Sequence, residues 1–355
     1  MRTKTEGTHR GDDAAATSTR ASNAVLDVEN LTVRYKVADG YFTAVDNVSF
    51  RVAPGEQVAI VGESGSGKTN TCLAIAGVLT HPNAVIEADA ITFQGTSIAQ
   101  RKRTRLPHRI PGLAMVFQDA STSLDPVWTV GSQLIDILRA TQKISRKNAK
   151  AKAAEWLRKV GMADPERVMK SRPYELSGGM RQRVMVALAL AGNPRLLIAD
   201  EPTSALDATL SVEIMQLLVA LTTETGTGLI LVTHDIHLGQ AFTERMLVMY
   251  GGRIVEEGPS STLDTTAVHP YTQALMRSVP TLESAGLDVL PTIPISATGQ
   301  HDPAGGCSFL PRCDQAHDAC AVPPQRTELG GGCSAACWLV ATESELALTA
   351  SAKGA

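Results

Sequence analysis

The glycine-rich segment GESGSGKT, residues 62–69, constrains the fold of this chain more than any other stretch. It matches the pattern G-x-x-x-x-G-K-[ST], follows the apolar run VAIV and precedes a helix-like segment. In such a loop, glycines let successive backbone N–H groups converge on phosphate oxygens, and the following helix adds positive potential. We therefore predict a nucleotide-phosphate site formed by Gly62, Glu63, Ser64, Gly65, Ser66, Gly67, Lys68, Thr69 and Asn70.

Two residues of this loop have specific predicted roles. Lys68 would reach the β- and γ-phosphates of ATP and assist catalysis, and the Thr69 hydroxyl would ligate Mg²⁺. Because strand, loop, Lys-Thr pair and helix occur in the required order, we interpret the loop as functional and not as a simple turn.

Apolar runs that alternate with helix-like segments over residues 25–264 predict the α/β class. EQVAIVG, GLAMVFQ, RLLIAD and GLILVTHD are short and nearly uninterrupted, as in strands buried on both faces of a parallel sheet. The block from VLDVENLTVRYKV to AVDNVSFRV instead alternates apolar and polar residues. That alternation predicts an antiparallel sheet at the front of the chain.

Residues 121–172 are predicted to be helical. The segment SRKNAKAKAAEWLRKVGM is rich in Lys and Arg, but Ala153, Trp156, Leu157 and Val160 mark one apolar face. The charges would then lie on the solvated face, and a net charge of −3 gives no general attraction to nucleic acid. We therefore expect no nucleic-acid partner.

An acidic pair follows the apolar run in RLLIADEPTSALD. Because parallel strands end at one edge of a sheet, Asp200 and Glu201 are expected beside the phosphate loop. We predict that Asp200 holds Mg²⁺ and that Glu201 is the general base for the attacking water. His234 ends another buried run, LILVTHD, and would hydrogen-bond the γ-phosphate at the same edge.

The segment LSGGMRQRVMVALALAGNP provides a second predicted helix start. Ser177, Gly178 and Gly179 would open this helix and form another anion-binding N-terminus. One nucleotide needs only one anion-binding helix N-terminus of this kind. The helix start at Ser177 is therefore predicted to bind the ATP of another subunit.

In their order, the motifs GESGSGKT, VFQD, LSGGMRQR, LLIADEP, SALD and VTHD resemble the nucleotide-binding subunit of ABC transporters, over about residues 25–258. The resemblance implies a P-loop NTPase core with an antiparallel β subdomain and a helical subdomain at about residues 119–175. It also implies a head-to-tail dimer, with ATP and Mg²⁺ between one subunit's phosphate loop and the LSGGM segment of the other.

The same resemblance implies roles for further residues. Gln118 would contact Mg²⁺ and sense the membrane subunit, and the loop 204–207, which ends at Asp207, would cross the dimer interface. His234 would be the switch histidine, in agreement with its position. An aromatic side chain near the start should stack on adenine, and Tyr35 fits this position best, with Tyr41 as the alternative.

FQDASTSLDPVWTVGSQL, HPYTQALMRSVP and GCSFLPRC are similar to segments of the oligopeptide/dipeptide importers, a group that includes nickel importers. This similarity implies an ATPase subunit that drives peptide uptake, with nickel or another small solute as the alternative cargo. A soluble ABC ATPase without a role in transport is less consistent with these segments. The implied partners are a second homologous ATPase subunit, two transmembrane permease subunits and an external solute-binding protein.

The chain is expected to divide into a disordered tail (1–24), the nucleotide-binding domain (25–264), a C-terminal domain (265–340) and a short tail (341–355). The first residues lack the apolar centre of a secretory signal, and no stretch approaches 18 uninterrupted apolar residues. Together with the resemblance, which implies association with membrane subunits, these features predict a peripheral protein at the cytoplasmic face of the cell membrane.

Five of the six cysteines lie between residues 307 and 337. A reducing compartment disfavours disulfides between these cysteines. A second interpretation is that they are free buried thiols. We predict that Cys307, Cys313, Cys320 and Cys337 are ligands of a structural metal site, with Cys333 as a fifth candidate. Zinc is less consistent because Cys307, Cys313, Cys320 and Cys337 form no tight C-x₂₋₄-C pair among themselves, and the resemblance favours a [4Fe–4S] cluster. This Cys-rich region is expected to be a small appendage that does not continue the sheet.

Overall fold

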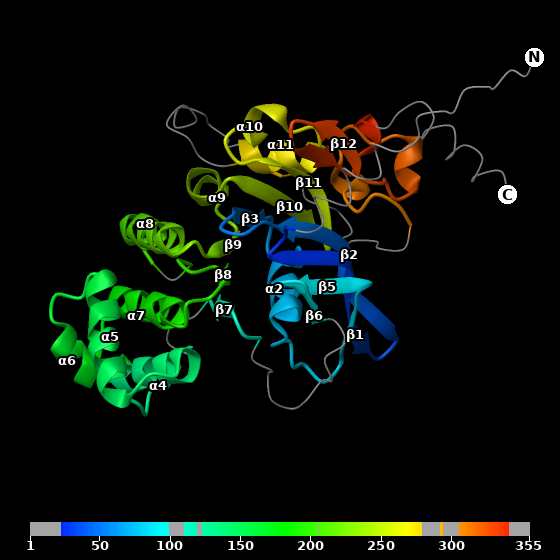
Figure 1. Cartoon of the computed structure of the whole chain (residues 1–355). Helices are drawn as coiled ribbons and strands as arrows, with labels where there is room; N and C mark the ends of the chain where they lie inside the picture. The colour runs from blue at the N-terminus through cyan, green and yellow to red at the C-terminus, as the bar shows by residue number, and fades with distance from the viewer. Residues whose placement is uncertain are drawn as a thin grey trace, which may run out of the picture.

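An eight-stranded sheet runs through the centre of the protein (Figure 1). The computed structural model describes residues 23–98, 110–118, 123–204, 206–278, 292–293 and 305–340. Both predicted tails lie outside these residues, apart from residues 23 and 24. The strand order is β12-β13-β11-β10-β3-β9-β8-β7.

The middle of this sheet is parallel, as the apolar runs predict. Its strands are β7 (Leu113–Val116), β8 (Leu196–Asp200), β9 (Gly228–Thr233), β3 (Gln57–Val61) and β10 (Arg245–Tyr250). Every residue of β3, β8 and β9 is buried, because helices or other strands cover both faces. The carboxyl ends of β3, β8 and β9 therefore lie along one edge of the sheet.

A second, five-stranded sheet is antiparallel, as the alternating pattern predicts. Its strands are β1 (Leu26–Val37), β2 (Gly40–Val52), β4 (Ala84–Glu87), β5 (Ala90–Phe93) and β6 (Thr96–Ser97). Helix α2 (Lys68–Ala76) lies between the two sheets (Figure 1), and its Cys72 and Ile75 belong to a core shared with both. This packing fixes the helix that begins in the phosphate loop.

A group of helices lies to one side of the main sheet, beyond β7 and β8 (Figure 1). The helices are α4 (Val130–Gln142), α5 (Arg146–Lys159), α6 (Pro165–Lys170) and α7 (Gly178–Ala191), with a 3₁₀ turn at Pro173–Glu175. Thr129, Ser145 and Asp164 begin α4, α5 and α6 as N-caps, each accepting a backbone N–H. The predicted apolar face of α5 packs into the core: Ala153 and Leu157 are fully buried.

Two further helices each follow a strand of the main sheet. Helix α8 (Ala208–Thr225) follows β8, and α9 (Ile236–Phe242) follows β9. Asp207 and Asp235 cap them, each with a carboxylate that accepts backbone N–H groups of the first turn. Both helices therefore begin at the sheet edge that carries Asp200 and Glu201.

The C-terminal region continues the main sheet, so the prediction of a separate Cys-rich appendage is wrong. Strand β13 (Cys333–Ala335) pairs antiparallel with β11 (Arg253–Pro259), and β12 (Thr327–Gly330) pairs with β13. The physical reason is that β11 would otherwise leave the N–H and C=O groups of an edge strand unpaired. Short elements complete this region: α10 (Leu263–Thr266), α11 (Pro270–Arg277), and 3₁₀ turns at Leu310–Arg312, Asp318–Ala321 and Trp338–Val340.

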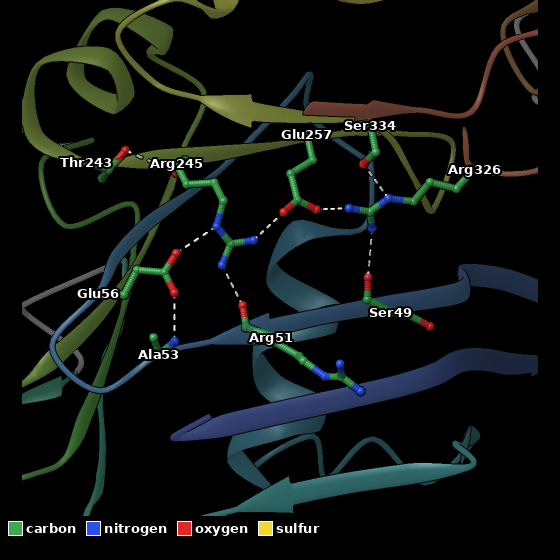
Figure 2. A network of polar contacts seen from close by, with 9 residues as sticks. All are labelled: Ser49, Arg51, Ala53, Glu56, Thr243, Arg245, Glu257, Arg326 and Ser334. Atoms are coloured by element: carbon green, nitrogen blue, oxygen red, sulfur yellow. Dashed lines mark hydrogen bonds and ion pairs between the residues drawn. The ribbon is translucent and has the colours of Figure 1, made fainter. Parts of the chain in front are cut away.

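A network of charged side chains joins the C-terminal strands to the front sheet (Figure 2). Arg245 donates to Glu56 at 2.7 Å and to Glu257 at 2.5 Å. Arg326 pairs with the other oxygen of Glu257 and donates to the Ser49 carbonyl at 3.2 Å. The carboxylate of Glu257 thus lies between two guanidinium groups, one from β10 and one from the C-terminal region.

Candidate functional site

The phosphate loop connects β3 to α2 and has the glycine conformations that the motif requires. Gly62, Gly65 and Gly67 all have positive φ angles, of 150°, 80° and 102°. A Cβ at Gly62 would lie 2.2 Å from the Met249 carbonyl oxygen, and one at Gly67 would lie 2.6 Å from that of Ala44. Only glycine therefore allows the loop to pass this close to β10 and β2.

Lys68 lies folded against the loop. Its Nζ donates to the carbonyl oxygens of Gly62 at 2.8 Å and Glu63 at 2.9 Å. Burial lowers the pKa of Lys68, while the nearby carboxylates of Glu201 and Asp200 raise it. The ammonium group is thus placed beside the loop, where it can bind anionic oxygens.

Thr69 and Asp200 meet across the sheet edge, as their motifs predict. The Thr69 Oγ1 donates to Asp200 Oδ1 at 3.1 Å, although the two residues come from α2 and β8. Burial raises the pKa of Asp200, and the hydrogen bond from Thr69 opposes that rise. A hydroxyl and a carboxylate oxygen are hard ligands of the kind that Mg²⁺ uses together with substrate phosphates, so these residues fit that ion.

Glu201 lies at the centre of a three-residue contact. Its Oε2 accepts a hydrogen bond of 2.7 Å from Gln118 Nε2, and its Oε1 lies 3.2 Å from His234 Nδ1. Gln118 follows β7, Glu201 follows β8 and His234 follows β9, so three neighbouring strands supply the group. The sequence predicted all three residues, and the structure places them in contact.

The backbone of Glu201 has an unusual conformation. Its φ angle is +46°, a left-handed value that costs a non-glycine residue about 1–3 kcal/mol. A hydrogen bond of 2.9 Å from its N–H to the Val232 carbonyl holds the residue against β9. This conformation turns the carboxylate toward Gln118 and His234, and is typical of functional sites.

The LSGGM segment begins helix α7, as predicted. Ser177 is the N-cap and its Oγ accepts from the Met180 N–H at 3.3 Å. A methyl group at Gly178 would meet no atom within 4 Å, whereas one at Gly179 would lie 2.8 Å from the Leu210 side chain. Among the residues that the structure describes, the Gly178 side of this helix start is therefore open.

The loop before α8 links Glu201 to this second helix start. Ser204 donates to the Glu201 carbonyl from both its N–H and its Oγ, each at 3.2 Å. Asp207 Oδ1 accepts from the Leu210 N–H at 2.9 Å, and Leu210 is the residue that packs on Gly179. Residue 205 lies outside the described part of the chain, as do residues 119–122 after Gln118.

The two candidates for adenine stacking differ in their surroundings. The Tyr35 hydroxyl donates to Asn70 Oδ1 at 2.5 Å, directly after the phosphate loop, and its ring meets His81 edge-on at 5.3 Å. Tyr41 is 59% exposed. Tyr35 is therefore the one tied to the loop by a hydrogen bond.

Two residues that the sequence did not single out contact the loop. Glu63 donates its backbone N–H to the Tyr271 hydroxyl at 2.9 Å, and its carboxylate accepts from Arg312 at 2.8 and 3.1 Å. Both lie in segments, HPYT and FLPRC, whose only signal in the sequence is their family resemblance. No local pattern indicates this contact, because the partners are more than 200 residues apart.

The predicted metal site at the cysteines is wrong. Among the described residues, which include all six cysteines, no group of three or more Cys, His, Asp or Glu side chains could hold a metal ion. This finding overturns both the [4Fe–4S] cluster and the zinc alternative at Cys307, Cys313, Cys320 and Cys337. Burial raises the pKa of Cys337 to about 11, which keeps the thiol protonated at neutral pH.

The cysteines instead serve as packing residues. Cys307 and Cys313 pack against a core of aromatic and apolar side chains, and Cys320 and Cys337 are buried. Buried free cysteine behaves as a small apolar side chain, in agreement with the alternative interpretation of free buried thiols. Cys333 lies in β13, where its Sγ approaches Gly258 of β11.

Two families match this chain. Residues 45–204 match the ABC transporter family, and residues 255–320 match the oligopeptide/dipeptide transporter C-terminal region. The first match spans the phosphate loop, α7 and Glu201, and the second spans α11 and the first three clustered cysteines.

Similar proteins include a dipeptide transport ATP-binding protein of Haemophilus influenzae, 43% identical over 86% of this chain and 93% of that protein. An oligopeptide transport ATP-binding protein of the same species is 39% identical over 91% of this chain and 100% of that protein. The fold is similar to an ATP-binding cassette solved as a dimer with ADP and Pi (29% identity, TM-score 0.56, 66% of this chain, 98% of that one). The chain therefore belongs to the ABC transporter family, among the ATP-binding subunits that carry the oligopeptide/dipeptide transporter C-terminal region.

Proposed function

We propose that this chain hydrolyses ATP to drive the uptake of dipeptides or oligopeptides through membrane subunits. The observation that carries the proposal is the position of Glu201, between Gln118 and His234 and beside the Thr69–Asp200 pair. The relatives named for dipeptide and oligopeptide transport support the class of cargo.

The residues of the loop would bind the phosphates of ATP. Backbone N–H groups between Gly62 and Asn70 and the N-terminus of α2 supply positive potential, and Lys68 adds a charge at the β- and γ-phosphates. Thr69, Asp200 and Gln118 would hold Mg²⁺, which when bound offsets negative charge on the phosphates.

Glu201 would act as the general base. Its carboxylate takes a proton from a water molecule as the water oxygen attacks the γ-phosphorus, and the bond to the β–γ bridging oxygen breaks, so that ADP leaves. Gln118 and His234 hold the two carboxylate oxygens from opposite sides. His234 would also hydrogen-bond the γ-phosphate, because its side chain is 59% exposed and remains reachable.

A second ATPase subunit would complete the site. Ser177, Gly178 and Gly179 begin a helix whose open side is free to meet phosphates bound by a partner, and Asp207 lies in the loop that would cross the interface. The dimeric ATP-binding cassette with a similar fold supports this arrangement. We further propose that the partner is a homologous chain and not a second copy.

An apolar groove between the main sheet and the helices would receive a permease subunit. It has a volume of about 670 Å³ and is lined by Phe117, Leu124, Trp128, Ile137 and Leu188, among others. Trp128 is 60% exposed, which is unusual for so large an apolar side chain. Phe117 directly precedes Gln118, whose side chain donates a hydrogen bond to Glu201. Binding of a permease segment in this groove would therefore change the position of Gln118 relative to Glu201.

The chain would associate peripherally with the cytoplasmic face of the membrane through these permease subunits. Within the residues that the structure describes, none of the helices has the length and apolar character needed to cross a bilayer. An external solute-binding protein would deliver the cargo to the permeases.

Reconstitution tests the proposal. The chain, co-purified with its partner ATPase and permeases, is placed in vesicles with the solute-binding protein, and uptake of a labelled dipeptide is compared with that of Ni²⁺. ATP-dependent dipeptide uptake, lost in the Glu201→Gln variant, is expected. Uptake of Ni²⁺ without dipeptide would refute the cargo, and absence of ATP hydrolysis would refute the ATPase assignment.

A further inference from the structure

The C-terminal region holds the phosphate loop at Glu63, a contact that the motif alone does not explain. The Arg312 guanidinium forms a bidentate pair with the carboxylate, with N–O distances of 2.8 and 3.1 Å. The Tyr271 hydroxyl accepts the Glu63 N–H at 2.9 Å. Bidentate Arg–carboxylate pairs are among the stronger and more directional of ionic contacts.

Both partners of Glu63 are fixed by a buried aromatic cluster. The Tyr250 and Tyr271 rings lie 4.5 Å apart, and Phe309 meets the Tyr250 ring edge-on at 5.1 Å. The Arg312 guanidinium lies over the Tyr250 and Phe309 rings, at 5.6 and 5.9 Å. Because its side chain is only 13% exposed, Arg312 is held in one position and not left free at the surface.

The charge of Glu63 makes this contact relevant to ATP. Glu63 is an acidic residue inside a loop that binds a highly anionic ligand, and an unpaired carboxylate there would repel the phosphates. Arg312 neutralises this carboxylate and keeps it turned toward α11 and the aromatic cluster. The hydrogen bonds from Arg312 to the Glu63 carboxylate also raise the pKa of Arg312, so its guanidinium group stays charged.

We propose that Arg312 is a positioning residue for ATP binding, which acts by neutralising and orienting Glu63 of the phosphate loop. Tyr271 assists by fixing the Glu63 backbone. This inference rests on the proposed ATPase function, and it gives the C-terminal region a direct effect on the affinity of the nucleotide site. Turnover at saturating ATP is not affected, because Arg312 does not touch Glu201, Gln118 or His234.

The test is a set of four variants in the intact complex: Arg312→Met, Arg312→Lys, Glu63→Gln and the double variant Glu63→Gln/Arg312→Met. Arg312→Met should weaken ATP binding by about three- to tenfold, because the unpaired Glu63 carboxylate would repel the phosphates. The value of kcat should not change. Arg312→Lys, which keeps the charge, should restore most of the affinity. The double variant should bind ATP as tightly as the wild type, because no unpaired carboxylate remains.

Arg326→Met is the matched control. Arg326 lies in the same C-terminal region and pairs with Glu257, away from the loop, so its loss should leave the ATP affinity unchanged. All affinities are measured by titration with ATP at a temperature where each variant is folded. If Arg312→Met does not fold, Glu63→Gln alone still tests the idea. It should bind ATP more tightly than the wild type, because the Glu63 carboxylate no longer offsets the positive charge of Arg312 beside the loop, whereas a contact without a role would leave the affinity unchanged.

Three results would overturn the proposal. They are an unchanged ATP affinity in Arg312→Met, a double variant as weak as Arg312→Met, or an unchanged or weaker affinity in Glu63→Gln alone. A wild-type complex that binds no ATP would instead refute the proposed function, so the two failures can be told apart.

Discussion

The Gln118 side-chain amide donates a hydrogen bond of 2.7 Å to the Glu201 carboxylate, across two neighbouring strands and 83 positions of sequence. His234 contacts the other carboxylate oxygen from the next strand. The Glu201 side chain is 16% exposed, so most of it is shielded from water. The parallel order β7-β8-β9 is what brings these three side chains to one point.

Replacing Glu201 with Gln should abolish turnover while ATP still binds. Loss of a general base lowers kcat by about 10²–10⁴-fold, and the amide keeps the size of the side chain. Phosphate release under single-turnover conditions measures the chemical step, and ATP titration measures binding. Glu224→Gln is the control, because Glu224 pairs with Lys159 at the surface. Hydrolysis at the wild-type rate in Glu201→Gln would refute its role as base.

The two glycines of the LSGGM segment should respond differently to substitution by Ala. A methyl group at Gly178 meets no atom of the described residues within 4 Å, so Gly178→Ala should change the free energy of unfolding by less than about 0.5 kcal/mol. At Gly179 it would lie 2.8 Å from the Leu210 side chain, which would have to move, so Gly179→Ala should be the more destabilising of the two. Urea unfolding measures both values.

The Gly178→Ala variant should nevertheless lose ATP-driven association with the partner ATPase. The added methyl group would occupy the space next to the partner's phosphates. Association is measured by size-exclusion chromatography with Glu201→Gln as the background. Normal association in Gly178→Ala would argue against a nucleotide at this helix start.

Tyr35→Ala should weaken ATP binding by about five- to tenfold, because stacking of one ring on a base contributes about 1 kcal/mol or more. Tyr35→Phe keeps the ring and should bind nearly as well as the wild type. Tyr41→Ala is the matched comparison at the neighbouring strand position, since Tyr41 pairs with Lys36 in the register of β1 and β2. A larger loss in Tyr41→Ala than in Tyr35→Ala would move the stacking role to Tyr41.

His269 should make the protein less stable in acid. Burial lowers its pKa from 6.5 to about 4, so the unfolded chain binds a proton that the folded chain excludes between these values. Its stabilising contribution is complete above pH 6.5 and decreases as the pH falls toward 4, by about 3 kcal/mol in total.

The variant His269→Asn isolates this effect. Asn still accepts the Tyr271 N–H as an N-cap, a contact that His269 makes at 3.1 Å, but it does not titrate. Urea unfolding at pH 7.5 and pH 4.5 should give a smaller difference for this variant than for the wild type. An equal difference would assign the acid sensitivity to other groups. The neighbouring Glu256 is not one of them, because burial raises its pKa and protonation then favours the folded state as the pH falls.

Glu257→Ala should destabilise the fold by about 2–3 kcal/mol. The carboxylate is 12% exposed and lies between Arg245 and Arg326 (Figure 2), so its removal leaves two guanidinium groups without their shared partner. Glu166→Ala, which breaks an exposed pair with Arg158, should cause no measurable change. Chemical unfolding compares the two, and equal effects would show that the network contributes no more than a surface pair.

The sequence alone determined the nucleotide core, because its features are local. The buried strands before Gly62, Asp200 and His234 follow from uninterrupted apolar runs, and the glycine conformations follow from the loop motif. The order of strands and helices then predicts which strand ends share an edge, and so which side chains meet. The roles of these side chains remain predictions that the variants above test.

The arrangement of the C-terminal region depends on tertiary structure, and the prediction made for it from the sequence was wrong. Five clustered cysteines favoured a metal site, yet the described side chains form no such group, because spacing along the chain does not fix where thiols lie in space. The pairing of β13 with the open edge of β11 and the contact of Arg312 with Glu63 join segments far apart in the chain. Such contacts depend on sheet edges and packed aromatic rings that exist only once the core has formed, so no local pattern encodes them.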